Sequence, residues 1–210
     1  NEPRHAYGRT ALLLSGGAAM GFYHVGVVRA LFEARMLPRV LSGASAGSLL
    51  MAIIGTRTDE ELSFLFDGHN MRMDFFRLER SSHNKDELLK RLQFVIPQSL
   101  RWMSDLFISL LFDRGGILKM DTEYFKRVVF ENTGPMTFQE AFDRTGRIIN
   151  ITVAPKNNYD PPRLLNYLTA PHVLVWSAAV ASCAVPGIFD ATPLLVREPD
   201  GSVRPEEIGS

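Results

Sequence analysis

The sequence offers little from which to build a disulfide, a membrane span or a charged binding face. Its 210 residues include one cysteine, Cys183, so no disulfide can form within the chain, and the apolar run around it predicts a buried thiol. No apolar run reaches the roughly 20 residues that a membrane-spanning helix needs. The 23 Lys and Arg residues balance 23 Asp and Glu residues, so no global positive field favours nucleic acid. A lone cysteine is consistent with a reducing, intracellular compartment.

What is present predicts a single domain over residues 1–210. The apolar content of 46% and the charged content of 22% are ordinary for a globular chain that buries a core. Because the chain begins with Asn1 rather than Met, we expect a fragment truncated at one or both ends. A missing segment would then be free to carry a leader or an anchor.

Strand and helix patterns alternate along the chain. Short apolar or alternating runs predict strands at 10–14, 39–42, 147–153, 163–168 and 192–197, with residues 147–168 forming a hairpin. Helical spacing and cap signals predict a helix ending near residue 37 and further helices at 46–54, 58–66, 85–95, 99–112, 121–129, 137–145 and 171–184. This order indicates an α/β layered fold with a mostly parallel central sheet.

A G-x-S-x-G pattern follows the second predicted strand. Gly43, Ser45 and Gly47 form it, and an apolar helix begins immediately afterwards. The pattern is typical of a strained strand-to-helix turn that carries a nucleophilic serine, because the flanking glycines remove side chains that would crowd it. The helix N-terminus adds backbone N–H groups near the developing negative charge. We therefore predict Ser45 as a catalytic nucleophile.

A second glycine turn lies about thirty residues earlier, after the first predicted strand. Gly16, Gly17 and Ala18 offer backbone N–H groups of the kind that an oxyanion hole requires. A dinucleotide site is the alternative for a glycine turn of this kind. It needs G-x-G-x-x-G and an acidic residue about twenty positions later, whereas the spacing here is G-G-x-x-x-G and the nearest acid, Glu33, lies within the predicted helix. The two turns together favour a serine hydrolase.

Four motifs, taken in order, resemble the patatin-like phospholipases and acyl hydrolases. They are residues 15–21, 23–31, 43–48 and 175–187, and the run 165–171 is similar to the triacylglycerol-lipase branch of fungi and plants. The resemblance implies a patatin-like three-layer fold with helices on both faces of the sheet. It also implies a Ser–Asp dyad without a catalytic histidine, acting on acyl esters of triacylglycerol or phospholipid.

The sequence offers several candidates for the catalytic partner of Ser45. The resemblance calls for a late Asp-Gly, which Asp200 and Gly201 supply, although the same residues form an ordinary turn signal. The rival is an aspartate outside this chain, and Asp190 ranks below both. A Ser–His–Asp arrangement would instead draw on His69, His83 or His172. We interpret His24 as a packed or hydrogen-bonded residue rather than a base.

Ser99–Phe112 is the most apolar predicted helix. It is either a core helix or a lid that meets a lipid-droplet or membrane surface, where we expect the protein to work as a peripheral, intracellular enzyme. No calcium-ligand spacing is present, and we predict no metal or cofactor. The alternative from a different class is a non-catalytic lipid-binding or scaffold domain on the same fold.

Overall fold

The computed structural model describes residues 10–67, 72, 75, 78–80, 118–155, 161–184 and 189–206. The helices predicted at 85–95 and 99–112 lie outside the described residues, as do His69 and His83. The described elements follow in this order: β1 (Ala11–Leu14), η1 (Ala18–Phe22), α2 (Tyr23–Glu33), β2 (Val40–Gly43), α3 (Ala46–Gly55), α4 (Asp59–Phe66), β3 (Leu78–Arg80), β4 (Leu118–Met120), α7 (Thr122–Thr133), α8 (Phe138–Thr145), β5 (Ile148–Val153), β6 (Arg163–Leu165), α9 (Val175–Ser182), β7 (Leu195–Arg197) and β8 (Val203–Pro205).

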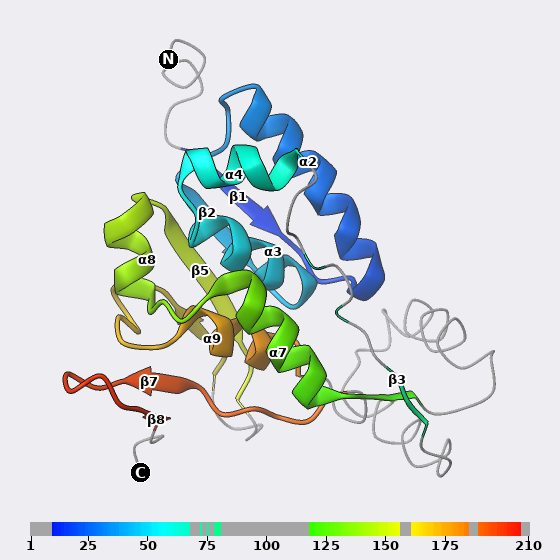
Figure 1. The fold of residues 1–210 in the computed structure, drawn as a ribbon, viewed down its shortest axis with the longest axis vertical. Helices are drawn as coiled ribbons and strands as arrows, with labels where there is room; N and C mark the ends of the chain where they lie inside the picture. Colours follow the sequence, from blue (N-terminus) through cyan, green and yellow to red (C-terminus); the bar gives the residue numbers. More distant parts are fainter. Residues whose placement is uncertain are drawn as a thin grey trace.

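The main sheet has the strand order β1-β2-β5-β6 (Figure 1). Strands β1, β2 and β5 are parallel neighbours, and β6 is antiparallel to β5. The predicted mostly parallel sheet and the hairpin of residues 147–168 are therefore confirmed. Two short antiparallel pairs, β3 with β4 and β7 with β8, lie outside this sheet. The parallel register brings the C-terminal ends of β1 and β2 side by side, which is where both glycine turns begin.

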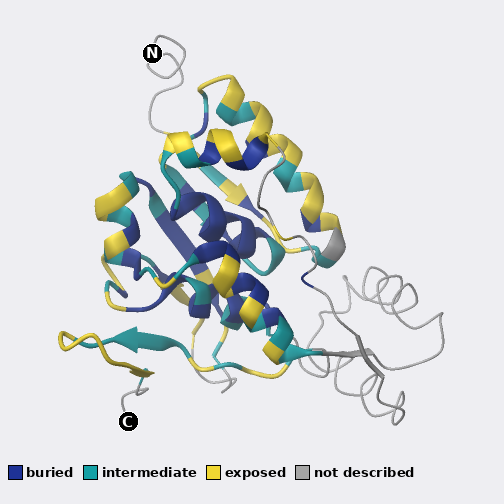
Figure 2. Cartoon of the chain, viewed as in Figure 1, coloured by how far each residue is buried: buried dark blue, intermediate teal, exposed yellow. Residues whose placement is uncertain are grey.

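Helix α3 packs on one face of the sheet and supplies the centre of the core. Nine of its ten residues are buried, Gly47 to Gly55 (Figure 2). A Cβ added at Gly55 would overlap the side chain of Ile149 on β5, so the helix lies directly against that strand. Register pairs Ile149 with the buried Leu41 on the same face. Helices α7 and α9 pack beside α3.

The opposite face of the sheet is more open among the described residues. Leu13 on β1 is 72% exposed there, and Leu164 on β6 is 48% exposed. The second helical layer that the family resemblance implies thus stays a prediction. No helix within the described ranges is long and apolar enough to cross a membrane.

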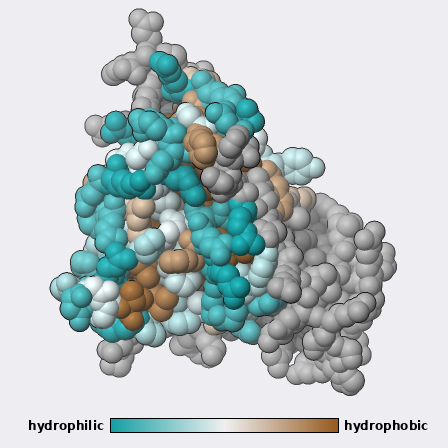
Figure 3. Space-filling view, in the orientation of Figure 1, coloured by the Kyte–Doolittle hydropathy of each residue, from teal (hydrophilic) through white to brown (hydrophobic). Residues whose placement is uncertain are grey.

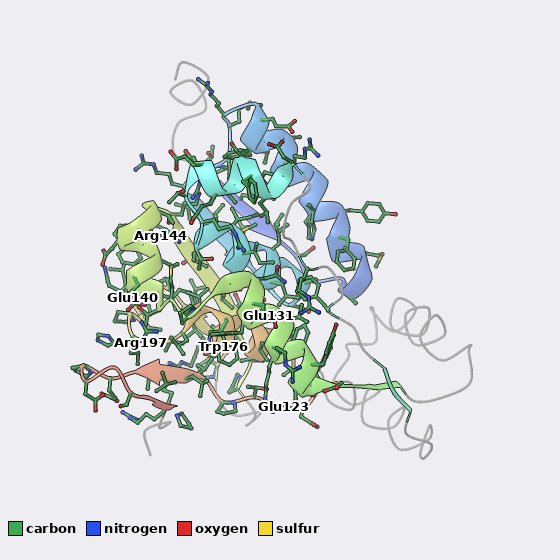
Figure 4. All side chains as sticks on the ribbon, in the orientation of Figure 1. Glu123, Glu131, Glu140, Arg144, Trp176 and Arg197 are labelled. Carbon is green, nitrogen blue, oxygen red and sulfur yellow. The ribbon has the colours of Figure 1, made fainter. Side chains whose placement is uncertain are left out.

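Charged pairs join the outer helices to their neighbours. Arg144 on α8 pairs with Glu61 on α4 at 2.5 Å, and Glu140 on α8 pairs with Arg197 on β7 at 2.6 Å (Figure 4). In Figure 3 the surface over α8 is mostly hydrophilic, and apolar atoms gather where β7 crosses. These pairs are half-exposed, so they orient the elements and contribute little to stability.

Several predicted boundaries differ from the structure: the helix expected to end near residue 37 ends at Glu33, α7 continues to Thr133 rather than ending at 129, and β7 begins at Leu195 rather than at 192. Two further differences have a clear cause. Helix α9 begins at Val175 rather than at 171, because the segment before it forms bridges instead: Val173 pairs with Val196, and Leu174 with Thr137. Strand β6 ends at Leu165 rather than at 168. There the Asn166 side chain accepts hydrogen bonds from the N–H groups of Leu168 and Thr169, which closes a turn.

Candidate active site

Ser45 occupies the sharp turn between β2 and α3, as predicted. It is the N-cap of α3 and has φ 50° and ψ −124°. A non-glycine residue in this region of positive φ is strained, and a serine held so between a strand and a helix is the geometry of a nucleophile elbow. Ser45 is half-buried. Its carbonyl accepts hydrogen bonds from the N–H groups of Ser48 and Leu49, which begins the helix.

The two glycines that flank Ser45 are required by close backbone approach. A Cβ at Gly43 would lie 2.5 Å from the carbonyl carbon of Gly47, and one at Gly47 would overlap the carbonyl oxygen of Leu14. Neither glycine has a positive φ. Their role at this turn is therefore to leave room for the chain, while the strained conformation falls on Ser45 itself.

The early glycine turn lies against the elbow. Leu14 pairs with Gly43 across β1 and β2, and Ala44 donates its N–H to the Leu14 carbonyl at 3.2 Å. A Cβ at Gly16 would lie 3.0 Å from the Ser45 Cβ and 3.6 Å from its Oγ. The structure thus brings together Gly16 and Ser45, which are 29 positions apart in the sequence.

Backbone N–H groups are available in this turn. Among the described residues, no hydrogen-bond acceptor is found for the N–H groups of Gly16 and Gly17. Ala18 begins η1 with φ 46°. The carbonyl of Ser15, the residue before Gly16, accepts a hydrogen bond of 3.0 Å from Nε2 of His24 on α2. His24 is thus a hydrogen-bonded residue that holds the turn, in agreement with its interpretation from the sequence.

Helix α9 ends beside the elbow and contributes groups that the sequence did not single out. The N–H of Ser45 donates to Oγ of Ser182 at 2.9 Å, and that hydroxyl donates to the Thr152 carbonyl at 2.7 Å. A serine in a run of small apolar residues gives no sequence signal for such a contact. The sequence showed only that this run lies within residues 175–187, one of the four motifs that carry the family resemblance.

Cys183 follows Ser182 and is buried, as predicted. Burial raises the pKa of its thiol to about 12, and hydrogen bonds with the side chains of Ser45 and Ser48 act in the opposite direction. The thiol therefore stays protonated near neutral pH. A neutral, buried thiol is a poor nucleophile, so it does not compete with the Ser45 hydroxyl.

Asp200 is not brought to Ser45. It lies exposed in the turn between β7 and β8, where its Oδ1 accepts hydrogen bonds from the Ser202 hydroxyl at 2.6 Å and the Ser202 N–H at 2.9 Å. These two bonds lower its pKa. Figure 1 shows this turn at the outer end of the hairpin, away from α3. The structure thus agrees with the turn that Asp200 and Gly201 indicate in the sequence, and Gly201 has φ 86° there.

The other predicted base candidates lie elsewhere or outside the described residues. His172 is exposed, in the turn before α9, and its carbonyl accepts the Arg197 N–H. Asp190 is exposed and donates its N–H to Thr122 at 3.4 Å. Within the described ranges, no cluster of three or more His, Cys, Asp or Glu side chains has the arrangement of a metal site.

Comparisons with known proteins point in one direction. A model of the patatin-like phospholipase family matches residues 12–207. The chain is 41% identical over 207 residues to triacylglycerol lipase SDP1L of Arabidopsis thaliana, a match that covers 98% of this chain and 23% of that protein. It is 39% identical over 211 residues to triacylglycerol lipase 4 of Saccharomyces cerevisiae, covering 100% of this chain and 21% of that protein.

Among solved structures, the chain matches VipD from Legionella pneumophila. It is 15% identical, with a TM-score of 0.48, and the match covers 96% of this chain and 48% of VipD. The chain therefore spans about half of VipD, and only 23% and 21% of the two triacylglycerol lipases.

Proposed function

The chain belongs to the patatin-like phospholipase family, and on that premise we propose that it is the lipid acyl hydrolase domain of its protein, with Ser45 as the nucleophile. The substrate that we propose is triacylglycerol. The support is that relatives at 41% and 39% identity, in a plant and a yeast, are named triacylglycerol lipases. Phospholipid and lysophospholipid are the competing substrates.

The observation that carries the proposal is the contact between the two turns. Ser45 has a strained positive φ of 50°, and the Gly16 backbone approaches it so closely that a Cβ there would lie 3.6 Å from the Ser45 Oγ. Strain of this kind costs free energy of about 1–3 kcal/mol and persists where the surrounding structure holds it in place. An ordinary helix cap needs neither feature.

The proposed reaction has two acyl-transfer steps. The Ser45 Oγ attacks the ester carbonyl while a base removes its proton, and N–H groups of Gly16, Gly17 and Ala18 stabilise the oxyanion. The intermediate collapses to an acyl-serine and releases the alcohol, which takes up the proton. Water then attacks the acyl-serine, the fatty acid leaves, and Ser45 regains its proton.

The proposed reaction needs a base that takes the proton of the Ser45 hydroxyl. The family resemblance implies an aspartate, and Asp200 is the residue that the sequence offers. Its carboxylate is engaged by Ser202 within its own turn. An aspartate elsewhere in the longer protein is the rival, since the lipase relatives extend well beyond this chain.

The competing function is a non-catalytic lipid-binding or scaffold domain. Such a domain has no need of a strained serine, or of a glycine turn whose N–H groups find no acceptor in the described part of the chain, and both features are present here. A fluorophosphonate probe separates the two functions directly, because only an activated serine reacts.

The experiment uses the purified protein and its Ser45→Ala and Asp200→Asn variants. We expect the wild type to react with the fluorophosphonate and to release fatty acid fastest from triacylglycerol, and we expect Ser45→Ala to do neither. From the exposed position of Asp200 we expect Asp200→Asn to keep most of the activity. A loss of about a thousandfold or more in Asp200→Asn would restore the dyad assignment. Unchanged hydrolysis in Ser45→Ala would overturn the proposal.

We propose a peripheral, intracellular location at a lipid-droplet or membrane surface, because the proposed substrate is a lipid. The segment suggested for surface contact, Ser99–Phe112, lies outside the described residues. Co-sedimentation of the protein with triacylglycerol emulsions tests the surface binding independently of hydrolysis.

A further inference from the structure

We propose that Ser182 is a positioning residue for Ser45, whose hydroxyl fixes the backbone of the nucleophile against strand β5. The inference rests on the proposed function, because it concerns the same site. It starts from one oxygen atom: Oγ of Ser182 accepts the Ser45 N–H at 2.9 Å and donates to the Thr152 carbonyl at 2.7 Å.

The Ser182 hydroxyl lies at the point where β2 and β5 stop pairing. The pairing of β2 with β5 ends at Gly43 and Ile151, because β2 then turns away to form the elbow. Thr152 is the next residue on β5, and its carbonyl is the one that receives the Ser182 hydroxyl. The end of α9 thus bridges the two strands at the point where their own pairing stops. A serine hydroxyl suits this place because it is both donor and acceptor.

The bond acts on the strained residue itself. Ser45 has φ 50°, and its N–H precedes the first turn of α3, so no helical carbonyl is in position to accept it. Ser182 accepts this N–H and thereby favours the strained conformation over relaxed alternatives. Without an acceptor, the buried side of the elbow would lose a hydrogen bond, and Ser45 would be free to shift.

The hydrogen bond to Ser182 also decides whether the Ser45 N–H can bind an oxyanion. Because the Ser45 N–H is engaged by Ser182, it is not available to bind an oxyanion. The N–H groups of Gly16 and Gly17 have no acceptor among the described residues, so they remain available for that role. The alignment of Ser45 with that turn is what Ser182 maintains, so its loss is expected to slow the chemical step.

The chain offers a matched control on the same helix. Oγ of Ser177 also bridges two backbone groups: it accepts the Leu195 N–H at 3.0 Å and donates to the Leu174 carbonyl at 2.8 Å. Both serines lie on α9 and both make one accepted and one donated bond. Only Ser182 bonds to Ser45, so a general effect of deleting a bridging hydroxyl appears equally in both variants.

The experiment measures kcat and KM for a p-nitrophenyl acyl ester, and the rate of fluorophosphonate labelling, in Ser182→Ala, Ser182→Thr and Ser177→Ala, with Ser45→Ala as reference. We expect kcat and the labelling rate of Ser182→Ala to fall about tenfold to a hundredfold, as for a nucleophile displaced by a fraction of an ångström to one ångström. KM should stay within about twofold, because substrate binding is not touched. Ser182→Thr keeps the hydroxyl and should recover most of kcat, and Ser177→Ala should keep it.

The outcomes separate the positioning role of Ser182 from the proposed function. If Ser182→Ala keeps the kcat of Ser177→Ala, the positioning role is overturned while inactive Ser45→Ala still upholds the proposed function. If Ser45→Ala stays active, both proposals fall. Should Ser182→Ala not fold, Ser182→Cys retains the volume and replaces the oxygen by a weak acceptor, and it is expected to lower kcat in the same way. A Ser182→Cys protein with unchanged kcat would contradict the inference.

Discussion

At the scale of single residues, the geometry of the site depends on positions where glycine, which has no Cβ, leaves room for the neighbouring chain. The glycines at 16, 21, 43 and 47 all face atoms that a Cβ would touch or overlap, and these atoms belong to the elbow or to the turn beside it. The sequence predicted Gly43 and Gly47 from the elbow pattern and Gly16 from the oxyanion turn. A glycine at position 21 of a helical pattern also predicted a close neighbour, either the sheet or the nucleophile helix, and the structure identifies it as Ala46 at the start of α3.

Gly16→Ala tests whether the contact between the turns matters for catalysis. The added Cβ would lie 3.0 Å from the Ser45 Cβ, which is closer than the optimum of about 3.5–4.0 Å between carbon atoms, so Ser45 or the turn must move. We expect kcat for a p-nitrophenyl acyl ester to fall at least about tenfold. The urea midpoint of unfolding should change little, since the shift is local.

Gly26→Ala is the control for that substitution. Gly26 lies in the interior of α2, and nothing lies within 4 Å of the position that its Cβ would take. Alanine should therefore keep the activity and stabilise the protein by about 0.5–1 kcal/mol through its helix propensity. Equal activity in the two variants would show that the Gly16 contact has no part in catalysis.

At the scale of elements, both ends of α8 were predicted well, whereas the start of α9 was not. The capping box of Thr137 and Glu140 is formed in both directions, and Gly146 ends α8 in the left-handed conformation, as the sequence indicated. Such signals are local, so they survive in any tertiary setting. The start of α9 was wrong because Val173 and Leu174 pair with residues far away in the sequence, which no local pattern records.

Thr137→Ala tests the cap of α8. The substitution removes the acceptor for the Glu140 N–H in a buried threonine, and we expect the free energy of unfolding to fall by about 1 kcal/mol, measured by urea denaturation. Thr137→Ser keeps the hydroxyl and should lose much less. If serine costs as much as alanine, packing of the threonine methyl group, rather than the cap, holds this end of α8.

At the scale of the whole molecule, the order of elements and the position of Ser45 were readable from the sequence, and the catalytic pairing was not. A parallel sheet follows from alternating strands and helices, and the elbow follows from a local pattern of five residues. The base and the positioning groups are different in kind. Asp200 matched a dipeptide but lies in its own turn, whereas Ser182 was not singled out within its motif and lies beside the elbow. The position of Asp200 in its own turn and the contact of Ser182 with Ser45 both depend on long-range packing.

The stability of the whole molecule should depend on pH through the buried thiol of Cys183. Burial raises its pKa in the folded state to about 12, while in the unfolded chain it titrates at about 8.5. Below the unfolded pKa the thiol is neutral in both states, so its contribution to stability is complete. Above it, the unfolded state loses a proton that the folded state retains. The free energy of unfolding should then decrease with pH by up to about 1.4 kcal/mol per unit until the pH approaches 12.

Cys183→Ala isolates this contribution, because the other groups that titrate in alkali are common to both proteins. We expect urea denaturation between about pH 8.5 and pH 10.5 to give a steeper loss of stability in the wild type than in the variant. At pH 8 the native thiol should resist a disulfide reagent that reacts promptly in denaturant, since its thiolate form is suppressed. Identical pH slopes, or a thiol that reacts rapidly in the native protein, would mean that Cys183 is accessible and that the α9 end of the site opens to solvent.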